Sequence, residues 1–413
     1  MSKHPTLSVP QPSDGTQINT PDGPSALPIN DRITDNDRYS RQILFPGIGA
    51  TGQHLLRSAH VAIVGVGATG AATASLLARA GVGTLTLIDR DFVEPSNLQR
   101  QVLFDEADAR ESLPKAEAAR RKIALFNSSI AVHTHIADLV PANIHELLSP
   151  AHLILDATDN FETRYLINDF AVQQSKPWIY AAAIGAYAAT MNILPRRSEN
   201  SAENKSRHPE RSEGPLYLSL WTEQSDVQSL AWVPTACLAC IFPKPPTGPV
   251  ETCDTSGILS TAVNLAASIQ ATEALKLLTH QPHLMRRTLL SFDLWSPEGQ
   301  GNIARSEINT STPNPTCTVC SQRIFSHLSG VGRPHITLCG RNSVQIHEHH
   351  RPIDFAAMRD RLAPHGSVRF NNLLLRFDHP PHTLTLFPDG RCLIQGTTDI
   401  TLARTLYARF IGS

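Results

Sequence analysis

The chain carries a glycine-rich turn and a downstream acid in an arrangement that suits a nucleoside phosphate. An apolar run at 61–64 leads into this turn and then into an alanine- and leucine-rich helix, and the candidate phosphate contacts are Gly65, Gly67, Ala68 and Gly70. Glycines let the main chain approach phosphate, and a helix N-terminus attracts an anion. A second apolar run, 84–88, ends at Asp89, where an acid can accept hydrogen bonds from ribose hydroxyls. We therefore predict a nucleotide site here.

Two cations follow the same site along the chain. Arg100 lies in the run SNLQRQ at 96–101, and Lys115 follows Pro114. Such side chains are usually solvated at the surface, but their position after Asp89 favours a role at the nucleotide. Positive charges at this place suit phosphoryl chemistry better than hydride transfer.

Four cysteines are spaced as metal ligands. Cys237 and Cys240 form one Cys-x-x-Cys pair, and Cys317 and Cys320 form a second. Each pair can place two thiolates about 3.5 to 4 Å apart on one metal. Four sulfur ligands close a tetrahedral Zn²⁺ site and leave no open position for substrate, so we predict a structural zinc. The alternative is four reduced thiols without metal.

The composition excludes several classes of partner. The 413 residues include 36 Lys and Arg and 37 Asp and Glu, so no excess charge marks a surface for nucleic acid or an anionic membrane. No apolar run approaches the roughly 20 residues of a membrane span, and the N-terminus lacks the features of a signal peptide. We therefore expect a cytoplasmic protein whose partners are small molecules or other proteins.

The chain divides into three parts. Residues 1–33 are rich in Pro, Ser, Asp and Thr and are expected to form a disordered tail. In residues 34–325 strand-like runs alternate with helical patterns, which predicts a Rossmann-like, doubly wound and mainly parallel α/β sheet. A polar, aperiodic stretch at 196–214 is expected to be a disordered insertion. Apolar residues at helical spacing predict a long buried helix over 257–278.

Residues 330–413 are predicted to form a separate small α+β domain. Strand-like runs flank the turn Pro388-Asp389-Gly390, which indicates a hairpin. The last helix is predicted to bury a stripe that consists of Leu402, Leu406 and Phe410. The lone cysteines Cys339 and Cys392 are predicted to be buried. The sequence indicates no role for this domain.

Several motifs together resemble the MoeB/ThiF family of adenylyltransferases, relatives of the ubiquitin-activating enzymes. The resemblance covers about residues 36–322 and includes RYSRQ at 38–42, AGVGTLTLID at 80–89, SNLQRQ at 96–101, Pro114-Lys115, DATDN at 156–160 and both Cys-x-x-Cys pairs. The glycine turn departs from the family's GxGGLG, because Ala68-Thr69 occupies its middle positions. The resemblance implies a homodimeric, ATP-dependent enzyme that adenylates the C-terminal glycine of a small ubiquitin-like sulfur-carrier protein of the MoaD or ThiS type.

The resemblance also implies roles for charged residues. A carrier carboxylate is ionised at pH 7, so its attack on the α-phosphate needs charge neutralisation and no general base. The residues implied for the triphosphate and the leaving pyrophosphate are Arg41, Arg100 and Lys115, with Ser96 and Asn97 at the phosphates and Asp89 at the ribose. Arg41 is further implied to enter the neighbouring subunit's site.

Asp159 is implied to hold Mg²⁺, with Asn160 beside it at the nucleotide. Alternatively or in addition, Asp159 caps a helix that begins near Phe161.

Cys253 precedes the helix predicted over 257–278, and a thiol at a helix N-terminus has a depressed pKa. The resemblance implies that Cys253 is a transfer cysteine, which takes the activated carboxyl or carries sulfur, while adenylation proceeds without it. The alternative is an unreactive loop cysteine.

Two other classes of function share some of these features. A zinc-containing NAD-dependent dehydrogenase would have the same glycine turn and cysteines, although we find no residues suited to hydride transfer. A non-catalytic nucleotide-binding scaffold is the other class. Convergence of Arg100, Lys115 and Asp159 on one pocket would argue against such a scaffold.

Overall fold

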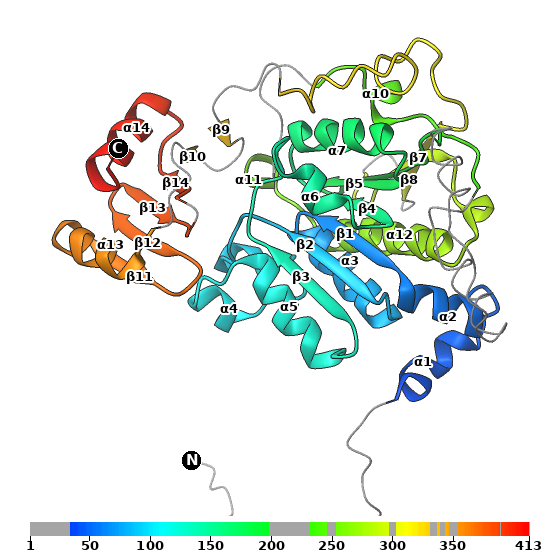
Figure 1. The fold of residues 1–413 in the computed structure, drawn as a ribbon, viewed down its shortest axis with the longest axis horizontal. Helices are drawn as coiled ribbons and strands as arrows, with labels where there is room; N and C mark the ends of the chain where they lie inside the picture. The colour runs from blue at the N-terminus through cyan, green and yellow to red at the C-terminus, as the bar shows by residue number, and fades with distance from the viewer. Residues whose placement is uncertain are drawn as a thin grey trace, which may run out of the picture.

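The structure is a computed structural model, and it describes residues 34–197, 231–245, 253–296, 303–330, 337–338, 343–346, 353–388 and 390–412. The predicted N-terminal tail and nearly all of the predicted insertion lie outside these residues. The described residues contain two sheets, one of eight strands and one of six (Figure 1).

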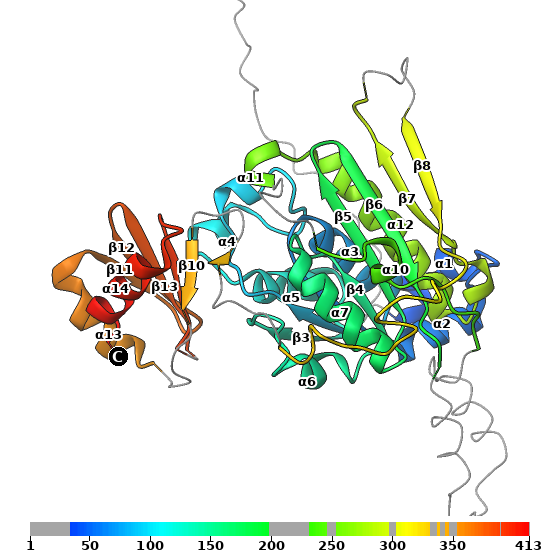
Figure 2. The same ribbon diagram turned by 90° about the horizontal axis from the view of Figure 1, so that it is seen from above.

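The larger sheet has the strand order β3-β2-β1-β4-β5-β6-β7-β8. Strands β1 to β5 pair in parallel, and β6, β7 and β8 extend the sheet in antiparallel pairs. Their bounds are β1 His60–Val64, β2 Thr84–Ile88, β3 Ala131–His135, β4 Leu153–Asp156, β5 Trp178–Ile184, β6 Tyr187–Ile193, β7 Thr288–Asp293 and β8 Ala304–Asn309. The predicted mainly parallel sheet is confirmed. The antiparallel edge, where β7 and β8 lie outermost, was not predicted (Figure 2).

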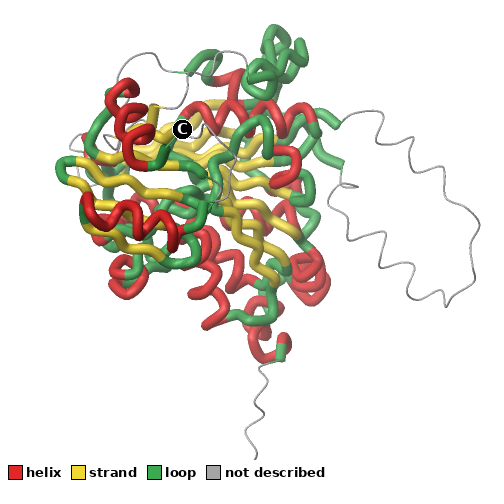
Figure 3. Tube along the Cα trace, turned by 60° about the vertical axis from the view of Figure 1, so that its left-hand side comes forward, coloured by secondary structure: helices red, strands yellow, loops and turns green. Residues whose placement is uncertain are grey.

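Helices cover both faces of this sheet (Figure 3). One face packs against α3 (Ala68–Ala80), α5 (Lys115–Phe126) and α12 (Ser260–Leu278), and the other against α6 (Ile144–Leu148) and α7 (Phe161–Gln173). Side chains of β1 alternate between these two cores, because successive residues of a strand point to opposite faces. Both faces of the central strands are therefore apolar, as the uninterrupted apolar run at 61–64 requires.

The order of the parallel strands creates a switch point between β1 and β4. The chain continues from β1 to β2 on one side, and it returns to β4 on the other. In open α/β sheets, ligands bind outside the carboxyl ends of the strands at such a point. The glycine turn follows β1, and Asp89 follows β2.

The long helix α12 begins at Ser260, so the predicted start near Gly257 is wrong. Gly257 has φ +69°, and Ile258 forms a parallel bridge with Gly185. The amide of Leu259 donates to the Gly185 carbonyl at 2.7 Å. Residues 258 and 259 are therefore held against the turn between β5 and β6, and the helix begins after them.

Shorter helices complete the larger unit. They are α1 (Asp35–Ile43), α2 (Gly49–Ser58), α4 (Glu106–Arg110), α10 (Leu238–Ile241) and α11 (Cys253–Ser256). Within the described parts of the chain, no helix has both the length and the apolar character needed to cross a membrane.

The predicted C-terminal α+β domain is confirmed, and its described residues form an antiparallel sheet with two α-helices. Its strand order is β11-β12-β13-β14-β10-β9. The elements are β9 Thr337–Leu338, β10 Ser343–Ile346, α13 Phe355–Leu362, β11 Ser367–Phe370, β12 Leu375–His379, β13 His382–Leu386, β14 Cys392–Gln395 and α14 Ile400–Phe410. The predicted hairpin is confirmed by the pairing of Leu386 with Cys392, although Asp389 lies outside the described residues.

One part of the C-terminal prediction is wrong. Leu402 is 38% exposed, whereas Ala403, Leu406, Tyr407 and Phe410 form the buried stripe of α14. The stripe follows i, i+3, i+4 and i+7 spacing from Ala403, and it leaves Leu402 beside this face. Cys392 is buried as predicted. Cys339 lies outside the described residues.

Candidate active site and cysteine cluster

Two glycines of the turn after β1 are required by close backbone approach. Gly65 has φ +85°, and a Cβ there would lie 2.7 Å from the Ala157 carbonyl oxygen. A Cβ at Gly70 would lie 1.8 Å from the Gly65 oxygen, so Gly70 lets α3 pack against the turn. Ala68 is the first residue of α3 and has no positive φ. An alanine therefore fits this position of the family's glycine motif.

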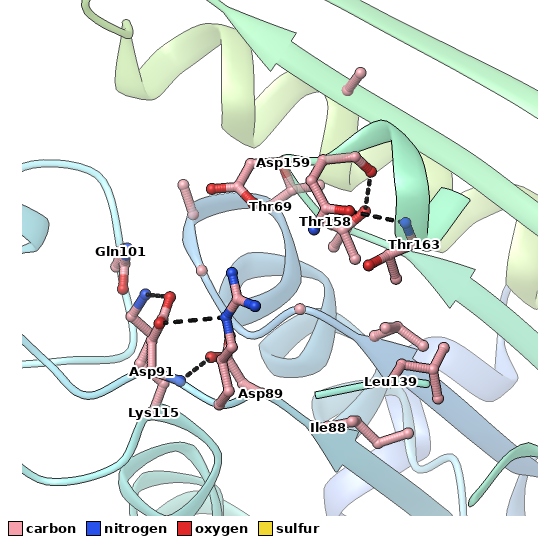
Figure 4. A pocket seen from close by; sticks show the side chains of 18 of the residues that line it. Thr69, Ile88, Asp89, Asp91, Gln101, Lys115, Leu139, Thr158, Asp159 and Thr163 are labelled. Atoms are coloured by element: carbon pink, nitrogen blue, oxygen red, sulfur yellow. Dashed lines mark hydrogen bonds and ion pairs between the residues drawn. The ribbon is translucent and has the colours of Figure 1, made fainter. Parts of the chain in front are cut away.

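A pocket lies at the carboxyl ends of β1, β2, β3 and β4. The residues predicted for the site that line it are Gly65, Gly67, Ala68, Asp89, Arg100, Lys115, Asp159 and Asn160. Figure 4 shows Asp91, Gln101 and Lys115 on one side of this pocket and Thr158 and Asp159 across from them. Four other residues predicted for it do not line it, and they are Arg41, Gly70, Ser96 and Asn97; the side chain of Cys253 lies outside the described part of the structure.

The Asp89 carboxylate is fixed at the end of β2 by two backbone amides. Val66 donates to Oδ2 at 2.6 Å, and Asp91 donates to Oδ1 at 2.7 Å. Burial raises the pKa of the Asp89 carboxyl, and the nearby Lys115 ammonium lowers it. The two amides lock its orientation toward the glycine turn and leave acceptor capacity on each oxygen.

Lys115 is the buried cation of the pocket. Its side chain is 2% exposed, and its Nζ lies 3.2 Å from Asp91 Oδ2. It begins α5, and its own amide donates to the Asp91 carbonyl at 2.8 Å. The fixed ammonium faces the pocket together with Arg100, which also donates to the Ser96 carbonyl at 2.7 Å. This arrangement can neutralise a polyphosphate.

Asn97 and Ser96 lie outside the pocket and build the turn that carries Arg100. Asn97 is 2% exposed, and its Oδ1 accepts the Glu94 amide at 3.2 Å. Its Nδ2 donates to Ser96 Oγ at 3.4 Å. The geometry thus gives Asn97 a structural position, and the predicted contact with phosphate stays a prediction.

Asp159 is free of the capping role that the sequence left open, because the neighbouring residue caps α7. Asn160 Oδ1 accepts the Thr163 amide at 2.8 Å, and Asn160 is the N-cap residue. The capping alternative for Asp159 is therefore wrong. Across the described residues, the exposed Asp159 carboxylate accepts no hydrogen bond, and it faces the pocket.

A buried polar network holds the loop that carries Asp159. Asp156 Oδ1 accepts the Thr158 hydroxyl at 2.7 Å, and Asp156 Oδ2 lies 3.2 Å from Arg164 Nε. Burial raises the pKa of the Asp156 carboxyl, and Arg164 lowers it. Gln270 of α12 is fully buried and donates to the carbonyls of Asp156 at 2.8 Å and of Ile179 at 2.9 Å. The end of β4 is thus tied to β5 and to a distant helix.

Sequence reasoning missed three charged residues that line the pocket. They are Arg90, Asp91 and Asp138. Arg90 and Asp91 lie two and three residues after β2, and Asp138 lies three residues after β3. Their positions just beyond carboxyl ends of parallel strands were the available signal. Arg90 and Asp138 form an ion pair at 2.5 Å.

Arg41 lies outside the pocket, and the structure describes only the backbone of Cys253. Arg41 is exposed in the last turn of α1, close in sequence to Leu44 and Phe45, which are 70% and 62% exposed. Cys253 begins the four-residue α11, and the long helix α12 starts only at Ser260, so Cys253 does not directly precede the long helix as predicted. Its backbone is five residues before Ile258, which lines the pocket.

The four predicted metal ligands come together in one cluster. Their sulfurs all lie within 4.8 Å of one another, and the Sγ–Sγ distances are 3.8 Å for Cys237 to Cys240, 3.6 Å for Cys237 to Cys317 and 3.4 Å for Cys240 to Cys320. Zinc–sulfur bonds of about 2.3 Å in a tetrahedron separate the sulfurs by about 3.8 Å. The donor set and spacing therefore fit Zn²⁺.

Two of these sulfurs each accept a contact from an amide group. Asn168 Nδ2 lies 3.8 Å from Cys237 Sγ, and the Asn314 amide lies 3.3 Å from Cys240 Sγ. Donors of this kind stabilise thiolate charge around a metal. The cluster joins α10 to residues 317–320, far from the pocket in sequence and separate from its lining.

Comparison with known proteins places this architecture in a family. The ThiF family model matches residues 39–319. The chain belongs to the ThiF family. It is 38% identical to the sulfur carrier protein ThiS adenylyltransferase of Bacillus subtilis, over 91% of this chain and 99% of that protein. It is 33% identical to a sulfur carrier protein adenylyltransferase of Thermus thermophilus, over 69% of this chain and 90% of that protein.

Other relatives match over less of their length. The probable adenylyltransferase/sulfurtransferase MoeZ of Mycobacterium tuberculosis is 36% identical, and this chain spans 57% of it. Among solved structures, Escherichia coli MccB with ATP is 23% identical and has a TM-score of 0.51, over 69% of this chain and 75% of that chain. The MccB likeness shows a shared fold.

These findings bear on the two alternative classes. Arg100, Lys115 and Asp159 converge on one pocket. This convergence argues against a non-catalytic nucleotide-binding scaffold. The relatives are named as adenylyltransferases, and this does not favour a dehydrogenase.

Proposed function

We propose that the protein is an ATP-dependent adenylyltransferase that activates the C-terminal glycine of a small ubiquitin-like sulfur-carrier protein. The observation that carries this proposal is the convergence of the glycine turn, Asp89, Lys115 and Asp159 on one pocket. Membership of the ThiF family and the names of its relatives support the same reaction.

The charges of the pocket suit an attack by a carboxylate. A carboxylate oxygen of the carrier would form a bond to the α-phosphorus of ATP. The bond from that phosphorus to the oxygen bridging to the β-phosphate would break, and pyrophosphate would leave. The incoming carboxylate is already ionised, so no side chain needs to remove a proton. Lys115 and Arg100 would neutralise the charge that develops on the leaving group.

The ribose and the phosphates would bind at opposite parts of the turn after β1. Asp89, held by two amides, presents acceptors for ribose hydroxyls. The N-terminus of α3 and the open approach at Gly67 would hold the phosphates, because a Cβ at Gly67 would find its nearest neighbour only at 3.8 Å.

Mg²⁺ fits the same pocket through Asp159. Its carboxylate is exposed to the pocket and, among the described residues, is not engaged as a helix cap. A bound Mg²⁺ would neutralise phosphate oxygens. Asp159 would hold the cation, and Asp156 and Arg164 would keep the Asp159 loop in place.

Arg41 would act across a two-fold dimer. It is exposed on α1, outside the pocket of its own chain, and exposed Leu44 and Phe45 follow it. In a symmetric dimer, α1 of each chain can place its Arg41 in the site of the other chain. A homodimer with Arg41 in the neighbouring site is therefore part of the proposal, and Cys253 would act only after adenylation.

The carrier we favour is of the ThiS type. The match to the ThiS adenylyltransferase covers 91% of this chain and therefore reaches into the C-terminal domain. The match to MoeZ covers only 62% of this chain. Reduced cysteine ligands persist in the cytosol, so we place the reaction there, with Zn²⁺ holding α10 to the segment at 317–320.

Exchange of labelled pyrophosphate into ATP tests this proposal. Purified carriers of the ThiS and MoaD types would be added separately, each beside a version that lacks its C-terminal glycine. We expect exchange with the intact ThiS-type carrier and none with the truncated one. Absence of exchange with every intact carrier, from a protein that contains zinc and binds ATP, would contradict the proposed reaction.

A further inference from the structure

The loop after β3 has one side in the nucleotide pocket and the other against the C-terminal domain. Ala137, Asp138 and Leu139 line the pocket. In the same loop, Ile136 packs in an apolar cluster with Phe92 and with residues of the C-terminal domain, which are Leu374, Phe387 and Leu393. A wall of the pocket is thus also part of the contact between the two units.

Two buried polar side chains of the C-terminal domain hold this loop. Gln345 of β10 is 5% exposed, and its Nε2 donates to Asp138 Oδ2 at 2.5 Å. Arg391, next to β14, is 3% exposed and donates to the Ile136 carbonyl at 2.5 Å. A second guanidinium nitrogen of Arg391 lies 4.0 Å from Asp138 Oδ2. The guanidinium also stacks on the Phe387 ring, 4.3 Å from its centre.

Asp138 connects these contacts to a cation of the pocket. Its Oδ2 faces Gln345 and Arg391, and its Oδ1 accepts a hydrogen bond from Arg90 at 2.5 Å. Arg90 and Asp138 both line the pocket. The position of the Arg90 guanidinium therefore depends on a carboxylate that the C-terminal domain orients.

We propose that the C-terminal domain completes the nucleotide site, and that Gln345 and Arg391 are positioning residues for nucleotide binding. This inference rests on the proposed function for the identity of the nucleotide, ATP. The two residues act through Asp138 and the Ile136 carbonyl, and they touch no substrate themselves. Their loss leaves Lys115 and Asp159 in place, so it weakens nucleotide affinity and spares the chemical step.

Binding of a non-hydrolysable ATP analogue, measured by calorimetry without carrier, tests the inference. Gln345→Met keeps the side-chain volume and removes the amide, and Arg391→Met removes the guanidinium. Mutations that touch neither ligand but lie in a coupled network change affinity by about 2- to 30-fold, and we expect weakening in this range. In exchange assays KM for ATP should rise similarly, with kcat within about twofold of wild type. Arg391→Lys should recover part of the affinity.

Arg361→Met is the matched control. Arg361 donates to the carbonyls of Phe410 and Ile411, inside the C-terminal domain and away from the pocket. It should lower the melting temperature without changing analogue affinity. Equal weakening by Arg361→Met would assign the effect to domain stability and would overturn the positioning role.

A double-mutant cycle with Asp138→Ala tests the route of coupling. If Gln345 acts through Asp138, then Gln345→Met should add little to the weakening that Asp138→Ala already causes. Additive effects, or wild-type affinity in folded Gln345→Met and Arg391→Met, would overturn the inference. Gln345→Met alone decides the outcome if Arg391→Met does not fold. Because binding is measured without carrier, it is independent of whether the proposed carrier reaction holds.

Discussion

Lys115→Met offers a sharp test of the charge arrangement in the pocket. The substitution keeps an unbranched chain of similar length and removes an ammonium that is 2% exposed and 3.2 Å from Asp91 Oδ2. If that ammonium stabilises the leaving pyrophosphate, its loss should slow exchange by about 10²- to 10³-fold, the usual effect of removing one preorganised charge donor. ATP binding should weaken less than the rate falls, because the charge on the leaving group grows in the transition state.

The cost to folding should be smaller than for a fully enclosed ion pair. Asp91 keeps 19% of its side chain exposed, so water can solvate it when Lys115 is gone. We expect a loss of about 1 to 3 kcal/mol in the free energy of unfolding. Lys115 lowers the pKa of Asp89, so this pKa should rise in the variant. The activity that remains should then be lost at a higher pH as acid is added, because protonated Asp89 offers a poorer acceptor to the ribose.

The assay is carrier-dependent exchange of labelled pyrophosphate at saturating ATP, with analogue binding measured in parallel. Asp91→Asn is the control, since it keeps the cation and removes only its partner, and it should retain the rate within about tenfold. Folded, zinc-containing Lys115→Met protein that keeps more than a tenth of the wild-type rate would refute the assigned role.

Four further outcomes are expected. Cys237→Ser should lose zinc and melt at a lower temperature, and metal analysis that finds stoichiometric zinc would contradict a four-thiolate site. Cys253→Ala should keep pyrophosphate exchange, whereas Asp159→Ala should slow it by roughly 10²-fold. Abolished exchange in folded Cys253→Ala protein would contradict the view that Cys253 acts only after adenylation. Mixed dimers of Arg41→Ala and Asp159→Ala chains should recover about a quarter of wild-type sites, and no recovery despite proven mixing would place Arg41 outside the partner's site. Burial lowers the pKa of His60 to about 4, so the folded state binds that proton more weakly than the unfolded chain, and the free energy of unfolding falls as pH drops from 6.5 toward 4. His60→Gln should reduce this loss by about 1 to 2 kcal/mol, allowing for solvent screening. Urea midpoints of the variant that keep the wild-type pH dependence would disprove this expectation.

The sequence by itself determined the features that depend on short spacing. The bounds of β2 follow from the apolar run at 84–88, and the structure matches them residue for residue. The Gly65 position needs a positive φ, and the two Cys-x-x-Cys pairs need only a turn each to present their thiols. These constraints act within a few residues, so a local pattern is sufficient to state them.

Only the tertiary structure decided which polar groups form hydrogen bonds with each other. Gln270 binds a carbonyl 114 residues away, and Gln345 binds a carboxylate 207 residues away, in both cases through side chains without a motif. Asn160 rather than Asp159 caps α7, because Asn160 is the residue directly before the first helical residue, Phe161. Hydrogen-bond partners depend on positions that the whole fold sets to within a fraction of an ångström. Apolar periodicity specifies which face of a helix or strand packs against the core. It carries no information on which polar group from a distant part of the chain lies within hydrogen-bond distance.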